Sequence, residues 1–463
     1  MADATNRAAP VPPSPHRRRR STKVVAALVC VAIVAAVVAI VALRDDGGPS
    51  SAAATTVASV ASTTAPTTSL APATTVAPPS TAGVAPTTSV PINAGGDFVA
   101  VAPTRLIDTR TGVGTGGKSG KSSSVTTSIV GLTGGMPAGL VKAVALNVTI
   151  AEATQAGYLT VSAAGTRPVD VSQIAFVSAT ASSLIVTRAN PEGLIELRLS
   201  DGASSHLIVD LLGYFVADRS PQNLSIVPEA QPVALADSRA GAPVAAGKTL
   251  DLTLAAPQSG AILGITATGA QGAGYLTVYG GARRPDTSAV NFAVGHDATA
   301  VSIVATSADR AVHIYNGSSA GVHIVVFQIA RLVAGAPADG LALNIEGTVA
   351  QDGRSAPFPF RTVDTRGSFT CPTNPGGGVS SVSSIFPKAK ALLVSITVVN
   401  PSVASYLIAY TGSAQPPSVA TLNYDAGEVR SNIALIPVSG DRVTILCGGG
   451  NPEYILDVMA TLE

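Results

Sequence analysis

One segment occurs three times in this chain of 463 residues. Gly-Tyr-Leu-Thr at Gly157–Thr160 recurs at Gly274–Thr277, and the third copy reads Ser-Tyr-Leu-Ile at Ser405–Ile408. The first two copies stay aligned at an offset of 117, within one residue, through several further matches. Agreement at separated points with hardly a gap indicates internal duplication, and units of this length are long enough to be domains.

Each copy has the sequence pattern of short β-strands. Apolar runs rich in Val, Ile, Leu and Thr are bounded by Gly, Pro, Asn and Asp. Ile195–Leu199 alternates between apolar and charged side chains, so one face of that strand is buried and the other is solvated. No segment after Leu43 has convincing helical periodicity. We therefore predict an all-β fold of three tandem antiparallel β-sandwich domains in a row, Ig-like or jelly-roll-like, at residues 97–218, 219–334 and 335–463.

The N-terminal part of the chain has a different character. Val24–Leu43 is a run of 20 residues without charge or proline, long enough to cross a bilayer as one transmembrane helix. Arg17–Arg20 and Lys23 precede it, so the positive-inside rule places residues 1–23 in the cytoplasm as a basic tail and the repeats outside the cell. A cleaved signal peptide, which would release a secreted protein, is the alternative. Residues 44–96, rich in Ser, Thr, Ala and Pro, are predicted to be a disordered stalk.

The charge distribution argues against nucleic acid as a partner. Seven of the 29 Lys and Arg lie in the first 50 residues, with three of the 28 Asp and Glu, so the remainder carries a net charge of −3. A phosphate-binding surface requires a clustered positive field, and the repeats contain no such cluster in sequence.

Two of the three cysteines, Cys371 and Cys447, lie in the third repeat. Two cysteines in one domain of an exported protein favour a disulfide, and two separate buried thiols are the alternative. A bridge here would close a loop of 76 residues, for which the chain-entropy model gives about 4 kcal/mol. No CxxC pair or Cys/His cluster has the spacing of a metal site, and we expect no metal and no cofactor.

Several motifs of the first copy together resemble a known repeat. They are Pro103–Arg110 (PTRLIDTR), Leu146–Thr149 (LNVT), Gly157–Val161 (GYLTV), Arg167-Pro168 and Ile208–Phe215 (IVDLLGYF). This set resembles a largely uncharacterised repeat domain of exported, cell-surface actinobacterial proteins, which sometimes lies beside hydrolase domains. The resemblance covers residues 98–463 and is weakest in the third copy. It implies an exported β domain and a bacterial source, and it implies no activity.

The copies depart from that pattern in two places. The second copy has Phe327–Ile329 where the first has Asp210–Leu212. The first and second copies also lack the cysteine pair that family members often carry.

An Asp-Thr/Ser-Arg motif precedes Gly-Tyr-Leu-Thr in every copy and supplies the candidate site residues. These are Asp108 and Arg110, Asp237 and Arg239, and Asp364 and Arg366. Two residues apart on a strand, the acid and the base would share a face beside an apolar residue, which indicates a partly buried ion pair or a turn clamp. Asp210 and Asp457, in the last strand of two copies, are candidate partners for that arginine. The structural interpretation is favoured, and a carboxylate-binding or sugar-binding arginine is the alternative.

Aromatic and imidazole side chains supply weaker candidates. Tyr158, Tyr275 and Tyr406 occupy one strand position and are expected to pack in the core, with a glycan-stacking surface as the alternative. His313 and His323 flank one predicted hairpin, but two histidines without a nearby acid make a weak metal site.

Enzyme signatures are missing from the sequence: there is no G-x-S-x-G, H-E-x-x-H, P-loop or dinucleotide fingerprint. We therefore expect no catalytic residues and a non-catalytic envelope-binding, adhesion or structural role at the cell surface. The expected partners are the membrane, through one helix, and either cell-wall polysaccharide or another surface protein. An extracytoplasmic sensor is the first alternative, and a cell-wall hydrolase of unrecognised type is the second.

Overall fold

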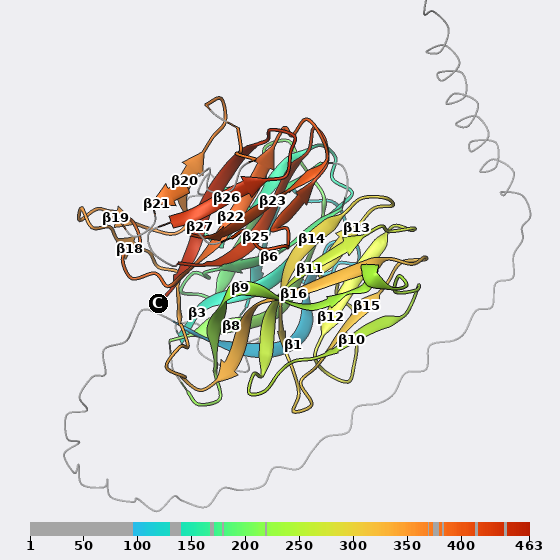
Figure 1. Cartoon of the computed structure of the whole chain (residues 1–463), viewed down its shortest axis with the longest axis horizontal. Helices are drawn as coiled ribbons and strands as arrows, with labels where there is room; N and C mark the ends of the chain where they lie inside the picture. Colours follow the sequence, from blue (N-terminus) through green and yellow to red (C-terminus); the bar gives the residue numbers. More distant parts are fainter. Residues whose placement is uncertain are drawn as a thin grey trace, which may run out of the picture. The chain divides into compact units, whose positions relative to one another are not determined.

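The computed structural model describes residues 96–463 except 130–139, 167–170, 178–179, 218–219, 369, 374–378, 382–383, 413–414 and 439–441. The predicted tail, membrane helix and stalk, apart from Gly96, lie outside these residues. Across the described ranges, no helix has the length and apolar character needed to cross a bilayer. The described residues form antiparallel β-sheets, as the all-β prediction requires (Figure 1).

Each repeat contributes two sheets, which we call its inner and its outer sheet. In the first repeat the inner sheet has the order β1 (Asp97–Asp108), β8 (His206–Val216), β3 (Val141–Ala151), β6 (Ala181–Thr187). Its outer sheet has the order β2 (Ser124–Ser128), β7 (Leu194–Leu199), β4 (Gly157–Ala163), β5 (Ile174–Phe176).

The second repeat repeats this order. Its inner sheet is β9 (Leu224–Asp237), β16 (His323–Ala334), β11 (Gly260–Thr268), β14 (Ala298–Ala305). Its outer sheet is β10 (Thr249–Thr253), β15 (Ala311–Asn316), β12 (Gly274–Tyr279), β13 (Val290–Phe292). The two inner sheets join edge to edge, where Phe98 of β1 pairs with Leu224 of β9.

The third repeat has the same plan with small additions. Its inner sheet is β20 (Phe360–Asp364), β27 (Glu453–Leu462), β22 (Ala391–Val399), β25 (Val429–Pro437), and β17 (Leu343–Asn344) also pairs with β27. Its outer sheet is β21 (Val379–Ser381), β26 (Arg442–Cys447), β23 (Ser405–Thr411), β24 (Leu422–Tyr424). A separate hairpin joins β18 (Thr348–Val349) to β19 (Ser355–Ala356).

A hydrophobic cluster lies between the two sheets of each repeat. In the first repeat Leu146 and Val209 of the inner sheet meet Leu159 and Leu197 of the outer sheet, all fully buried. Corresponding clusters occupy the second and third repeats.

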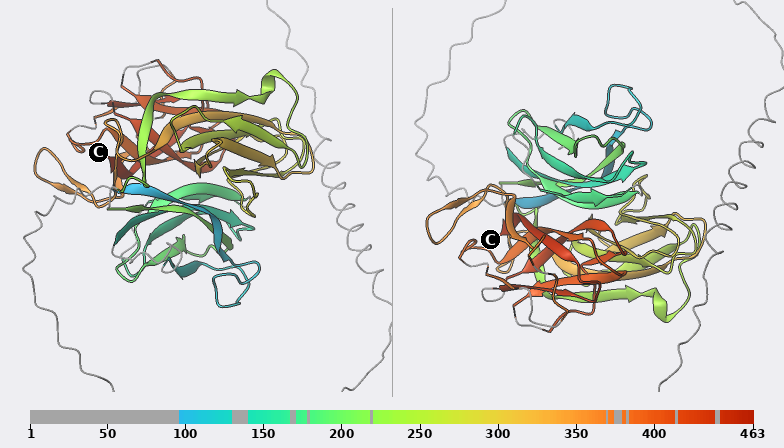
Figure 2. Two further views of the ribbon diagram at one scale, coloured as in Figure 1. Left: turned by 90° about the horizontal axis from the view of Figure 1, so that it is seen from below. Right: turned by 90° about the horizontal axis from the view of Figure 1, so that it is seen from above.

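A further cluster is shared by all three repeats. It includes Phe98 and Phe215 from the first repeat, Ile303 and Leu332 from the second, and Leu393 and Met459 from the third. Strands β6, β14 and β25 of the three inner sheets contact one another. Figure 2 shows the three repeats lying against one another in both views. The inner sheets are therefore covered on both faces, which explains why β8 and β22 are nearly continuous apolar runs while β7 alternates.

Hydrogen bonds between repeats close this arrangement into a ring. The Asn147 side chain of the first repeat donates to the backbone carbonyl of Ser288 in the second. The Asn423 side chain of the third donates to the Thr299 hydroxyl of the second, 2.8 Å away. Ser395 of the third donates to the carbonyl of Ser172 in the first, 2.9 Å away. The prediction of domains in a row missed this closure, because single-repeat patterns carry no information about contacts between repeats.

Candidate functional site

The Asp-Thr/Ser-Arg motif forms the same turn in each repeat. Strand β1 ends at Asp108, whose Oδ1 accepts from the backbone N–H and the Nε of Arg110, and whose Oδ2 accepts from its Nη2 at 2.7 Å. The other two motifs make the same bonds, with Nη2–Oδ2 distances of 2.6 Å. The expectation that acid and base share a strand face is wrong, because each arginine lies beyond the end of its strand and folds back on the aspartate.

These contacts keep the aspartates ionised. The hydrogen bond from Arg110 lowers the pKa of Asp108 even though burial opposes it. In the exposed second motif the Arg239 side chain lowers the pKa of Asp237 to about 2. The Arg366 side chain lowers the pKa of Asp364 in the same way. A carboxylate held with a low pKa and engaged on both oxygens is a poor general base at neutral pH.

The middle residue of the motif ties the first strand of each repeat to the last. The hydroxyl of Thr109 accepts from the backbone N–H of Leu207, 3.0 Å away. Ser238 and Thr365 accept in the same way from Ile324 and Tyr454, each at 2.8 Å. Sequence reasoning assigned this residue no role, although a hydroxyl at this position in every copy was a visible signal. The motif as a whole is therefore a clasp between the ends of two strands.

The buried aspartates of the last strands pair with a different arginine from the one expected. The Nε of Arg105 lies 2.5 Å from Oδ1 of Asp210, and the Nε of Arg361 lies 2.8 Å from Oδ1 of Asp457. Both aspartates are completely buried. Burial raises the pKa of Asp210 to about 6, and the hydrogen bond from Arg105 opposes that shift. The predicted partner, the motif arginine, is wrong because Arg105 and Arg361 lie directly opposite these aspartates in the strand pairing.

The second repeat has no charged pair at this point, and of the two residues that replace it Phe327 is buried while Ala234 is exposed. Ala234 of β9 lies opposite Phe327 of β16, where the other repeats have arginine opposite aspartate. Phe327 is only 8% exposed. The departure at Phe327–Ile329 noted in the sequence thus removes both charges of a buried pair.

The motif arginines remain partly accessible outside the clasp. The side chains of Arg110, Arg239 and Arg366 are 48%, 58% and 51% exposed. Asp108 is buried, whereas Asp237 is exposed. The contacts that recur in each motif are thus accounted for as links between strand ends, made by arginines that stay about half exposed.

The expectation that the three tyrosines pack in the core is wrong. Tyr158 and Tyr406 are 39% and 41% exposed, and Tyr275 is half-buried. In each outer sheet the neighbouring leucine, such as the fully buried Leu159, points inward, so the tyrosine points outward. The Tyr406 ring lies against Gly448 so closely that a Cβ there would come within 2.6 Å of it.

The two histidines of the predicted hairpin have separate partners. Nδ1 of His313 lies 2.7 Å from a carboxylate oxygen of Asp251, and Nδ1 of His323 lies 3.3 Å from the Ser238 hydroxyl. Among the described residues, no group of three His, Cys, Asp or Glu could hold a metal ion.

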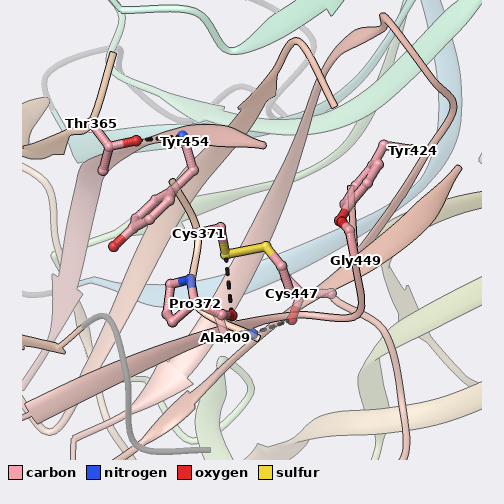
Figure 3. Close-up of a disulfide and its surroundings, with 9 residues drawn as sticks. Thr365, Cys371, Pro372, Ala409, Tyr424, Cys447, Gly449 and Tyr454 are labelled. Carbon is pink, nitrogen blue, oxygen red and sulfur yellow. Dashed lines mark hydrogen bonds between the residues drawn. A yellow bond between two sulfur atoms is a disulfide. The ribbon is translucent and has the colours of Figure 1, made fainter. Parts of the chain in front are cut away.

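Cys371 and Cys447 form a disulfide in the third repeat, shown in Figure 3. It fastens the segment that follows the third motif to the end of β26 in the outer sheet. The backbone N–H of Cys447 donates to the carbonyl of Pro372, 2.8 Å away, next to the bridge. The first and second repeats contain no cysteine.

Clefts lie at the junctions between repeats. One of about 610 Å³ lies between β1 of the first repeat and the segment 278–286 of the second. Another, of about 450 Å³, lies between the second and third repeats. Its walls include Phe327 and Arg239 of the second repeat and Tyr406, Ile408 and Leu446 of the third.

Comparison with known proteins adds no functional assignment. No protein-family model matches the chain, and no curated protein matches its sequence. The function must therefore be inferred from the motifs, the clefts and the charges described above.

Proposed function

We propose that this protein is a bacterial cell-surface protein, anchored by one membrane helix, whose repeats bind a component of the cell envelope without catalysis. The apolar run at 24–43 with its basic flank supports the anchor, with the N-terminus in the cytoplasm. The Ser/Thr/Ala/Pro-rich segment 44–96 supports a stalk that carries the repeats away from the membrane. In this proposal, three tandem β-sandwich domains at residues 97–218, 219–334 and 335–463 form the binding unit.

The clefts at the junctions between repeats carry this proposal. Binding sites are concave, are mostly lined by apolar side chains with a few polar groups, and occur often at domain junctions. The clefts of about 450 and 610 Å³ lie at such junctions, and polar and apolar side chains line them in similar shares. The charged groups of the motifs are, by contrast, paired with one another, which suits a scaffold better than a catalytic centre. Cell-wall polysaccharide is the partner we favour, and another surface protein is the alternative.

Retention on envelope material tests this proposal. We expect the full-length protein, purified in a mild detergent, to be retained by an isolated actinobacterial cell-wall polysaccharide fraction and to be absent from the wash. A protein that passes through unretained would contradict envelope binding and favour the sensor. Deleting residues 1–20 separates these two roles further, because only a sensor needs its cytoplasmic tail to transmit a signal.

A further inference from the structure

We propose that the cleft between the second and third repeats is a binding site for a neutral saccharide, with Tyr406 as the stacking surface and Arg239 and Asp297 as hydrogen-bonding groups. The inference rests on the proposed envelope-binding function and names the site and the ligand class. We refer to this cleft below as the saccharide cleft.

Two departures from the repeat pattern face each other across this cleft. On the second-repeat side, Phe327 replaces the buried aspartate that the other two repeats carry at that register. On the third-repeat side, Ile408 pairs across β23 and β26 with Leu446. The corresponding pairs in the first and second repeats each contain a threonine, namely Thr160 with Arg198 and Thr277 with Tyr315.

Phe327 from one repeat and the Ile408–Leu446 pair from the other give the cleft an apolar floor. Phe327, Ile408 and Leu446 all line the cleft and are each at most 8% exposed. Beside this floor Tyr406 is 41% exposed and rests against Gly448, where no side chain intervenes. A supported aromatic ring with one accessible face offers apolar contact area at one side and a hydroxyl at its tip. The C–H face of a sugar ring has matching chemistry.

The charged groups at the cleft disfavour an anionic ligand. Arg239 and Asp297 are the ionisable groups that line it beside Tyr406. Arg239 already binds Asp237 through Nε and Nη2, at 2.9 and 2.6 Å. Arg239, its partner Asp237 and Asp297 together carry one positive and two negative charges. Arg430, which donates to the backbone carbonyl of Asp297, is itself paired with Glu428 and does not change that balance. The local excess of negative charge disfavours a phosphate or carboxylate ligand.

The same groups suit a ligand rich in hydroxyls. Arg239 supplies donors, Asp297 is an exposed acceptor, and the Thr268 hydroxyl can do either. The Thr266 hydroxyl, which is hydrogen-bonded to that of Thr299 at 2.8 Å, has remaining capacity as an acceptor. A hydroxyl group both donates and accepts, so a neutral sugar can satisfy this mixed set without a net charge. The volume of about 450 Å³ lies within the range of small-ligand sites, roughly 300–1,000 Å³.

The test is affinity electrophoresis of the full-length protein, in a mild detergent, through native gels that contain a polysaccharide. The neutral probes are a galactan, a mannan and an α-glucan, and polygalacturonate is the acidic probe. We expect at least one neutral polymer to retard the protein more strongly than polygalacturonate. Tyr406→Ala should weaken that retardation roughly fivefold, which corresponds to a loss of about 1 kcal/mol for a stacked ring.

Matched controls separate the site from general effects on folding. Tyr158→Ala removes the equivalent, equally exposed tyrosine of the first repeat and should leave the retardation unchanged. Asp297→Asn should weaken retardation, whereas Asp201→Asn, an exposed aspartate of the first repeat, should not. The thermal midpoints of the four variants should stay close to that of the unmodified protein.

The outcomes distinguish this inference from the proposed function. If the envelope fraction retains the protein but Tyr406→Ala and Tyr158→Ala migrate alike in every gel, the saccharide cleft is refuted and envelope binding stands. Stronger retardation by polygalacturonate than by every neutral polymer would also refute it. If neither the envelope fraction nor any gel polymer binds the unmodified protein, both proposals fail.

Discussion

The first and second repeats have different side chains at the same point of their inner sheets, a charged pair in the first and uncharged residues in the second. Where β1 meets β8, Arg105 faces the buried Asp210, and where β9 meets β16, Ala234 faces Phe327. A buried ion pair gains little net stability, because desolvation offsets most of the attraction, so an apolar pair of suitable volume can replace it. What the two repeats share is that neither buries a charge without a partner: Asp210 is paired with Arg105, and Phe327 is uncharged. Replacing one member of the charged pair should therefore lower the stability of the protein far more than replacing both members together.

Removing one charge of the pair should have the largest effect. Arg105→Ala leaves Asp210 buried without its cation and should lower the free energy of unfolding by about 3–5 kcal/mol. The double variant Arg105→Ala/Asp210→Phe copies the second repeat and should recover much of that loss. Urea denaturation followed by intrinsic fluorescence measures both. A double variant no more stable than Arg105→Ala would contradict the equivalence of the two pairs.

The third repeat differs from the other two by its disulfide, and removing it should cost nearly as much. The Cys371–Cys447 bridge closes a loop with a sequence separation of 76, for which loss of chain entropy predicts about 4 kcal/mol. Paired Cys371→Ser and Cys447→Ser substitutions should therefore lower the denaturation midpoint sharply. Reducing agent should shift the unmodified protein by a similar amount and leave the double variant unchanged. If reducing agent also shifts the denaturation midpoint of the double variant, then loss of the disulfide is not the cause of that shift.

The pH dependence of stability should report on the protonation of the buried Asp210. The folded pKa of Asp210, about 6, lies above the ordinary 3.8, so the folded state binds more protons than the unfolded state between these values. The free energy of unfolding should therefore rise as pH falls from 6 to 4, by up to about 3 kcal/mol. Asp210→Asn should lack this rise. A variant with the same slope as the unmodified protein would assign the effect to other groups.

The exposed clasp of the second repeat should give the smallest effect. Arg239 and Asp237 are both well exposed, and such pairs contribute only about 0.2–1 kcal/mol. Arg239→Ala should therefore change the thermal midpoint by a degree or two at most, roughly. Arg110→Ala, whose partner Asp108 is buried, should cost more. Equal losses in the two variants would show that burial of the aspartate does not decide the strength of the clasp.

Local sequence patterns were sufficient for part of this structure. Strands such as Leu194–Leu199 follow from alternating side chains, and the cysteine pair stood out because both cysteines lie in one repeat. The tyrosine positions were misassigned, because in Gly-Tyr-Leu-Thr-Val both sets of alternate residues are apolar enough to face a core. Only the packing showed that Leu159 lies inside and Tyr158 outside.

The candidate site was predictable in its residues and in the pairing of acid and base within each motif, but not in its contacts between strands. The motif was visible in every copy, yet Arg105 and Arg361 were not recognised as the partners of Asp210 and Asp457. These pairs join residues about 100 positions apart, through strand pairings with irregularities in register. The saccharide cleft was not predictable, because its walls come from two different repeats.

By itself, then, the sequence determined that the repeats are antiparallel β-structure, because side-chain alternation and turn residues act over a few neighbouring positions. Tertiary structure decided which aspartate meets which arginine and how the repeats close on one another. Both depend on surfaces that form only when strands far apart in the chain are brought together. The shared cluster of Phe98, Ile303 and Leu393 exists because each inner sheet has a second apolar face to cover, and the other two repeats are what covers it.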